Sequence, residues 1–236
     1  MEEKIENAVQ FPAEEPEKAR LSAGRFLSLV CICYACMIVG NLVGIGVNLL
    51  LSPGSVNLIG EMVSSSENVP ETIIAFVGLA PLFEELVFRK ILVDRVLPYG
   101  EWPAILFSGI TFGLFHGNLT QFFYAALLGM ILAYVYIRTG RILYTIGIHA
   151  CINFLGGVLP ILAPAATFLV MLVALAGLVL FCMNVRKIRV ARNAVPGAGG
   201  ALFINVGMIL FLLISAALMA LVAVVMNHPE LSGKLL

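Results

Sequence analysis

Charged residues are scarce in this chain, and neither sign is in excess. Of its 236 residues, 14 are Lys or Arg and 14 are Asp or Glu, so charged residues make up 12% of the sequence and the net charge is zero. Soluble domains carry about twice that share. The scarcity of charge excludes a soluble globule and a disordered chain, and the absence of a basic excess excludes a nucleic-acid-binding protein.

The chain is instead rich in apolar residues. Hydrophobic residues make up 61% of the chain, and the mean hydropathy is +1.02. The apolar runs are long and continuous, which favours membrane-spanning helices over the alternating strands of a β-barrel. We predict an all-α, polytopic transmembrane helical bundle of about seven spans, at residues 26–51, 71–96, 103–117, 119–137, 142–159, 165–183 and 201–226.

The basic residues outside these spans fall on one side of the membrane if the N-terminus is cytoplasmic. The loops that would then lie outside contain no Lys or Arg, and only Lys234 follows the last span. This asymmetry predicts a multi-pass protein of the cell membrane with a cytoplasmic N-terminus. Residues 1–25 are expected to form an acidic cytoplasmic tail rather than a signal peptide, residues 26–227 a single transmembrane domain, and residues 228–236 a short C-terminal tail.

Several small and polar residues inside the predicted spans are expected to be structural. The clustered cysteines at 31, 33 and 36 do not share one helix face, so we interpret them as small apolar side chains rather than metal ligands, and no disulfide framework is expected. Helix packing is the expected role of the glycines spaced four residues apart and of three asparagines, namely Gly109, Gly113, Gly117, Asn41, Asn48 and Asn205.

Acidic and basic residues lie deep in only one predicted span. A charge within the hydrocarbon costs about 2.5–3.5 kcal/mol, so such residues normally face the bundle interior. In the span at 71–96, Glu85 and Arg89 are four residues apart with the acid first, the favourable order for a helical ion pair, and we interpret the pair as structural. Glu84 points about 100° away from Glu85 and has no obvious partner within its own helix.

Histidine and asparagine supply the remaining polar groups of a candidate site. His116 and His149 fall inside apolar spans, and Asn153 follows His149 by one turn on the same face. At about 1.5 Å per residue, these three residues and Glu84 lie about 12–20 Å from the cytoplasmic ends of three helices. A carboxylate beside a histidine can deprotonate water. We therefore interpret the four residues as one functional site rather than as separate packing contacts.

These residues also form a recognisable set of motifs. They resemble the three motifs of the CPBP (CAAX protease and bacteriocin-processing, or Abi) intramembrane proteases, whose eukaryotic and archaeal members are prenyl-protein endopeptidases of the Rce1 type. The resemblance covers roughly residues 70–155. The matching motifs, in order, are Glu84-Glu85-x-x-x-Arg89, Phe112-x-x-x-His116 and His149-x-x-x-Asn153.

The resemblance implies an intramembrane endopeptidase of the glutamic type. Its substrate would be a membrane-associated peptide or protein, cleaved in CAAX-type or in peptide and bacteriocin processing. Glu84 would activate water with the help of His116, and His149 and Asn153 would stabilise the tetrahedral oxyanion. Supporting roles would fall to Glu85, Arg89 and Phe112.

Two other classes of function remain open from the sequence. A zinc-dependent protease could use Glu84, His116 and His149 as ligands with a water as the fourth, although the chain lacks a His-Glu-x-x-His helix. We favour a site without a cofactor, with zinc as the alternative. A non-catalytic membrane immunity or scaffold protein, or a small transporter that uses the buried acid as a proton relay, is the other alternative. The expected partners are the lipid bilayer and a membrane-associated substrate, with no nucleic acid.

Overall fold

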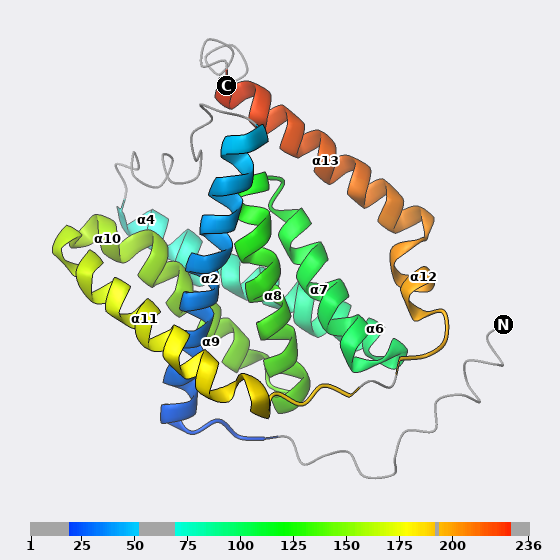
Figure 1. Cartoon of the computed structure of the whole chain (residues 1–236), viewed down its shortest axis with the longest axis horizontal. Helices are drawn as coiled ribbons and strands as arrows, with labels where there is room; N and C mark the ends of the chain where they lie inside the picture. Colours follow the sequence, from blue (N-terminus) through cyan, green and yellow to red (C-terminus); the bar gives the residue numbers. More distant parts are fainter. Residues whose placement is uncertain (1–18, 52–68, 192–193, 228–236) are drawn as a thin grey trace.

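Every regular element of the part of the chain that the structure describes is helical, which confirms the all-α prediction (Figure 1). The computed structural model describes residues 19–51, 69–191 and 194–227. The main helices follow the predicted apolar runs. They are α2 (Ala23–Leu51), α7 (Glu101–Phe115), α8 (Leu119–Thr139), α9 (Ile142–Asn153), α11 (Thr167–Asn184) and α13 (Val206–Asn227).

Four apolar segments in the described ranges are long enough to cross a membrane. They are Ala23–Leu51, Leu119–Thr139, Pro164–Lys187 and Val206–Val225, and two shorter apolar helices lie at Glu101–Phe115 and Ile142–Val158. The count of seven spans and the cytoplasmic N-terminus stay predictions. The predicted tails fall mostly outside the described residues, at 1–18 and 228–236, and α2 begins at Ala23, slightly before the predicted start of the first span.

The second predicted span folds as a succession of α and π turns. It runs through α4 (Val69–Ile73), the π-helix η1 (Ile74–Leu79), α5 (Ala80–Glu85), the π-helix η2 (Leu86–Val93), α6 (Asp94–Val96) and the 3₁₀ turn η3 (Leu97–Tyr99). Hydropathy predicted the position of this helix but not its π turns, which occur frequently at functional sites. The short α5 that carries Glu84 and Glu85 is therefore flanked by π-helix on both sides.

Helix α8 lies in the middle of the bundle, where α2 and α7 pack against it along much of their length (Figure 1). Helix α9 packs on α2 and α8, and α11 covers the outer side of α2. The core between them contains the fully buried Cys33 of α2, Leu132 of α8 and Ile148 of α9. This packing places α9 beside η1, α5 and η2 of the second predicted span. The motif on α9 therefore faces the motif on α5 and η2.

Two of the three predicted packing glycines bring α7 and α8 into close contact. A Cβ atom would lie 2.7 Å from the Ala126 carbonyl oxygen at Gly109, and 2.7 Å from the Phe122 carbonyl oxygen at Gly113. The prediction for Gly117 was wrong, because α7 ends at Phe115 and Gly117 lies beyond it with a φ of +58°. Gly117 thus serves the turn into α8, where a left-handed backbone favours glycine.

The packing at Gly113 can be tested by a single methyl group. Gly113→Ala is expected to destabilise the protein by about 1–3 kcal/mol, because the added carbon would overlap backbone of α8 that cannot move aside. Gly46→Ala in α2 is the matched control, since its added carbon meets nothing within 4 Å. Thermal unfolding in detergent measures both variants. An unchanged midpoint for Gly113→Ala would contradict the close helix contact.

The last predicted span is broken into two helices rather than continuous from 201 to 226. Helix α12 (Ala198–Phe203) ends before a break at Ile204 and Asn205, and α13 follows. The Asn205 amide caps both sides of the break: its Nδ2 donates to the Ala201 carbonyl oxygen at 3.0 Å, and its Oδ1 accepts from the Met208 N–H at 2.9 Å. A hydropathy window does not detect one capping side chain, so this break was missed.

Candidate active site

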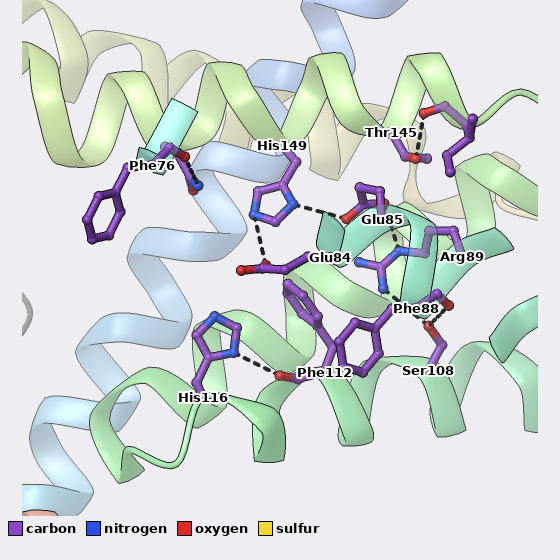
Figure 2. Close-up of polar contacts among 12 residues, drawn as sticks. Phe76, Glu84, Glu85, Phe88, Arg89, Ser108, Phe112, His116, Thr145 and His149 are labelled. Atoms are coloured by element: carbon purple, nitrogen blue, oxygen red, sulfur yellow. Dashed lines mark hydrogen bonds and ion pairs between the residues drawn. The ribbon is translucent and has the colours of Figure 1, made fainter. Parts of the chain in front are cut away.

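The side chains of the three motifs converge from three helices (Figure 2). Glu84 and Glu85 end α5, Phe112 lies on α7 and His149 lies on α9, while His116 is the C-capping residue of α7. His116 was predicted inside a span, and it lies at the end of its helix because α7 is only 15 residues long. The short α7 still brings this imidazole to the level of the glutamates (Figure 2).

His149 lies between the two glutamates and contacts both of them. Its Nδ1 is 3.0 Å from Glu85 Oε1, and its Nε2 is 3.7 Å from Glu84 Oε2. An ionised carboxylate can only accept, so the Nδ1–H of His149 donates to Glu85. The other ring nitrogen is thereby directed at Glu84, the residue for which the sequence offered no in-helix partner.

Glu85 and Arg89 form the predicted ion pair, which is completely buried. Arg89 Nε lies 3.0 Å from Glu85 Oε2, and both side chains have no exposed surface. Arg89 Nη1 donates to Ser108 Oγ at 3.4 Å, and its guanidinium carbon lies 4.7 Å from the centre of the Phe112 ring. A buried ion pair persists only when its groups are held by such further contacts.

Glu84 differs from Glu85 in its access to the surroundings. Its side chain keeps 20% of its surface exposed, whereas Glu85 is fully enclosed and the His149 side chain is 4% exposed. Of the two adjacent acids, Glu85 is bound to Arg89 and His149, and Glu84 is the one whose side chain keeps exposed surface. The two adjacent glutamates thus differ: Glu85 is buried and positions Arg89 and His149, whereas Glu84 is partly exposed.

A backbone carbonyl group of α7 fixes the tautomer of His116. Its Nδ1 lies 2.8 Å from the Phe112 carbonyl oxygen, which can only accept, so Nδ1 carries the proton and a neutral ring keeps Nε2 as an acceptor. The Phe112 ring contacts both imidazoles edge to face, with centroids 5.0 Å from His116 and 5.7 Å from His149. In Figure 2 the Glu84 carboxylate lies between the two imidazole rings.

Asn153 binds a backbone group of η1, in the second predicted span. Its Nδ2 donates to the Phe76 carbonyl oxygen of η1 at 2.8 Å. A side-chain amide has two N–H donors, so one remains for a further acceptor. The contact ties the end of α9 to η1, and the predicted role of Asn153 in oxyanion binding stays a prediction.

Sequence reasoning missed several residues that contact the site. Ser108 accepts from Arg89 and donates to the Phe88 carbonyl oxygen at 3.3 Å, and Tyr124 of α8 packs edge to face on His116 with centroids 6.5 Å apart. Thr145 is fully buried one turn before His149 on α9. Serine, threonine and tyrosine occur often in membrane helices as packing residues, so only the spacing of Thr145 from His149 could have indicated such a role.

A metal site was the alternative for the same residues. In the described ranges, no three His, Cys, Asp or Glu side chains are grouped closely enough to hold a metal ion. The proposed ligands Glu84, His116 and His149 are therefore not a preformed three-ligand cluster, and zinc dependence stays a question for metal analysis.

Comparison with known proteins finds a family that is similar to the part of the chain that contains the three motifs. Residues 67–155 match the family described as type II CAAX prenyl endopeptidase Rce1-like. This segment is therefore similar to the Rce1-like family. It contains all three motifs, so the resemblance predicted from them is confirmed.

Two curated proteins are similar to parts of the chain. Human CAAX prenyl protease 2 is 31% identical over 99 residues, which cover 33% of this chain and 30% of the relative. The putative membrane peptidase YdiL of Bacillus subtilis (strain 168) is 33% identical over 86 residues, which cover 36% of this chain and 35% of the relative.

The chain spans about a third of the length of these curated relatives. No solved structure matches it. The similarity to a putative membrane peptidase and the four apolar helices long enough to cross a bilayer identify the chain as a multi-pass membrane protein. Its Rce1-like segment runs from just before α4 to the start of η4 (Phe154–Val158).

Proposed function

We propose that this protein is an intramembrane endopeptidase that hydrolyses a membrane-associated peptide or protein with water activated by Glu84. One observation carries the proposal: a partly exposed carboxylate inside an apolar bundle lies 3.7 Å from His149 Nε2, while Glu85 holds the opposite ring nitrogen. The Rce1-like segment and the names of both curated relatives support the same class of reaction.

In the first step, Glu84 acts as the general base. Its carboxylate takes a proton from water as the water oxygen bonds to the carbonyl carbon of the scissile peptide. His116 assists by accepting a hydrogen bond at Nε2 from the second O–H of this water, since its Nδ1–H is held by the Phe112 carbonyl oxygen. The product of the step is a tetrahedral oxyanion and a protonated Glu84.

His149 and Asn153 stabilise this oxyanion in the proposed mechanism. Because the Nδ1–H of His149 is held by Glu85, the protonated form of the ring would offer its Nε2–H to the oxyanion. A donor to an oxyanion contributes about 10²–10³-fold in kcat. The C–N bond then breaks, and Glu84 returns its proton to the leaving amine.

The substrate is proposed to be a segment held in or at the bilayer. One relative is named a CAAX prenyl protease and the other a membrane peptidase, so prenylated C-terminal peptides and unmodified membrane peptides are both within the proposed class. These two substrate types differ by a lipid chain, which can be added or omitted in a synthetic peptide.

The experiment uses the full chain in proteoliposomes with two synthetic peptides, one with a farnesylated C-terminal Cys-a-a-X sequence and one with the same sequence unmodified. Mass spectrometry is expected to find a new peptide terminus with the wild-type protein and none with Glu84→Gln. Cleavage that stops with a chelator and correlates with stoichiometric zinc would support the zinc alternative. A second test compares cells that lack the protein with cells that express the wild type, Glu84→Gln or His116→Ala. If both variants restore the cellular phenotype as the wild type does, the protein acts by binding and the enzymatic proposal is wrong.

A further inference from the structure

Several exposed basic side chains gather at one end of the bundle, away from the proposed active site. We call this group the basic rim. It consists of Arg20 and Arg25 at the start of α2, Arg141 between α8 and α9, and Arg186, Lys187 and Arg189 after α11. All six are exposed.

Hydrogen bonds and helix packing hold these three segments together. The Ala19 N–H donates to the Arg138 carbonyl oxygen at 3.2 Å, which joins the start of α2 to the end of α8. The Arg138 side chain donates to the Arg189 carbonyl oxygen, which joins the same point to the segment after α11. Gly177 of α11 packs on Cys31 of α2, so the two helices run side by side toward this end (Figure 1).

The acids near the rim are already paired. Glu101 binds Arg138 through both carboxylate oxygens, at 3.1 and 2.7 Å, and also accepts from the Ala191 N–H at 2.8 Å. Asp94 pairs with Lys90 at 2.8 Å. Within the described ranges, none of the five rim arginines has an ion-pair partner, and Lys187 binds only the Asn184 amide oxygen, at 3.1 Å. Among the described residues, the positive charge of the rim is therefore uncompensated.

The position of the rim points to its ligand. Its members lie at the ends of apolar helices that are long enough to cross a bilayer, so in a membrane their side chains would lie at the level of lipid headgroups. The predicted orientation places them on the cytoplasmic leaflet, where anionic lipids concentrate. We propose that the basic rim binds the headgroups of anionic phospholipids, which would hold together the start of α2, the α8–α9 turn and the end of α11.

Lipid competition on the purified full chain tests this proposal. The probes are phosphatidylglycerol and phosphatidylcholine with identical acyl chains, and native mass spectrometry counts the bound molecules of each. We expect the wild-type protein to prefer phosphatidylglycerol, and we expect the preference to fall as salt rises. Neutralising Arg186, Lys187 and Arg189 to glutamine should reduce the preference about 100-fold, since each cation near an anionic surface contributes about fivefold.

The matched control is Lys234→Gln, compared with Arg189→Gln in the rim, because the predicted orientation places Lys234 on the opposite side of the membrane. Lys234→Gln should keep the preference for phosphatidylglycerol, whereas Arg189→Gln should reduce it about fivefold. Equal binding of the two lipids by the wild-type protein, or an equal loss in the control, would overturn the proposal. So would a preference that arises only after the six glutamates at positions 2–17 are changed to glutamine, because the chain's own acidic segment would then be the occupant. None of these outcomes depends on peptidase activity.

Discussion

Replacing Glu84 with glutamine is expected to lower kcat for peptide cleavage by about 10³-fold, with little change in KM. Glutamine has nearly the same shape as glutamate, but its amide cannot take a proton from water, and general acid–base catalysis contributes about 10²–10⁴-fold. The measurement is single-turnover cleavage of a reconstituted peptide substrate. Glu84→Asp should retain part of the activity, since it keeps the basic group at a shorter reach.

Glu71→Gln is the matched control for this variant. It makes the same chemical change on the same helix, at an exposed residue of α4. It should leave kcat and the unfolding midpoint unchanged. Glu84→Gln protein that folds normally and keeps more than about a tenth of the wild-type kcat would show that Glu84 is not the general base.

The sequence was sufficient to predict the parts of the site that lie within one helix. Glu85 and Arg89 are separated by one turn, and that spacing alone predicted their ion pair, which the structure contains at 3.0 Å. The bridge from His149 to Glu85 joins residues 64 positions apart on different helices, so no spacing rule could indicate it. Spacing also could not decide which of the two glutamates is enclosed and which is exposed, because that depends on how α9 packs.

Hydropathy was sufficient to predict the positions of the helices. It could not predict features that depend on single side chains or on individual hydrogen bonds. The apolar runs predicted the helices, since a buried or lipid-facing helix requires a continuous apolar stretch. The break at Asn205 and the π turns around α5 depend on individual backbone hydrogen bonds, which composition does not report. Gly117 shows the same limit, because its four-residue spacing from Gly113 has no meaning once α7 has ended.

Arg89→Met is expected to destabilise the protein by about 3–5 kcal/mol, the range for removing one partner of a buried ion pair. The Glu85 carboxylate would remain fully enclosed, with the His149 ring as its remaining side-chain partner. Thermal unfolding of the detergent-solubilised protein measures the loss. Arg95→Met is the control: it removes an exposed arginine from the same helix and should change little.

A second variant separates the charge of Arg89 from its packing. In the double variant Glu85→Gln with Arg89→Met, no unpaired carboxylate is left at this point, and the new amide oxygen can still accept from His149. This variant should recover much of the lost stability, because replacing both members of a buried pair is often close to neutral. Wild-type stability in Arg89→Met alone, or no recovery in the double variant, would show that an unpaired Glu85 carboxylate is not the cause of the instability.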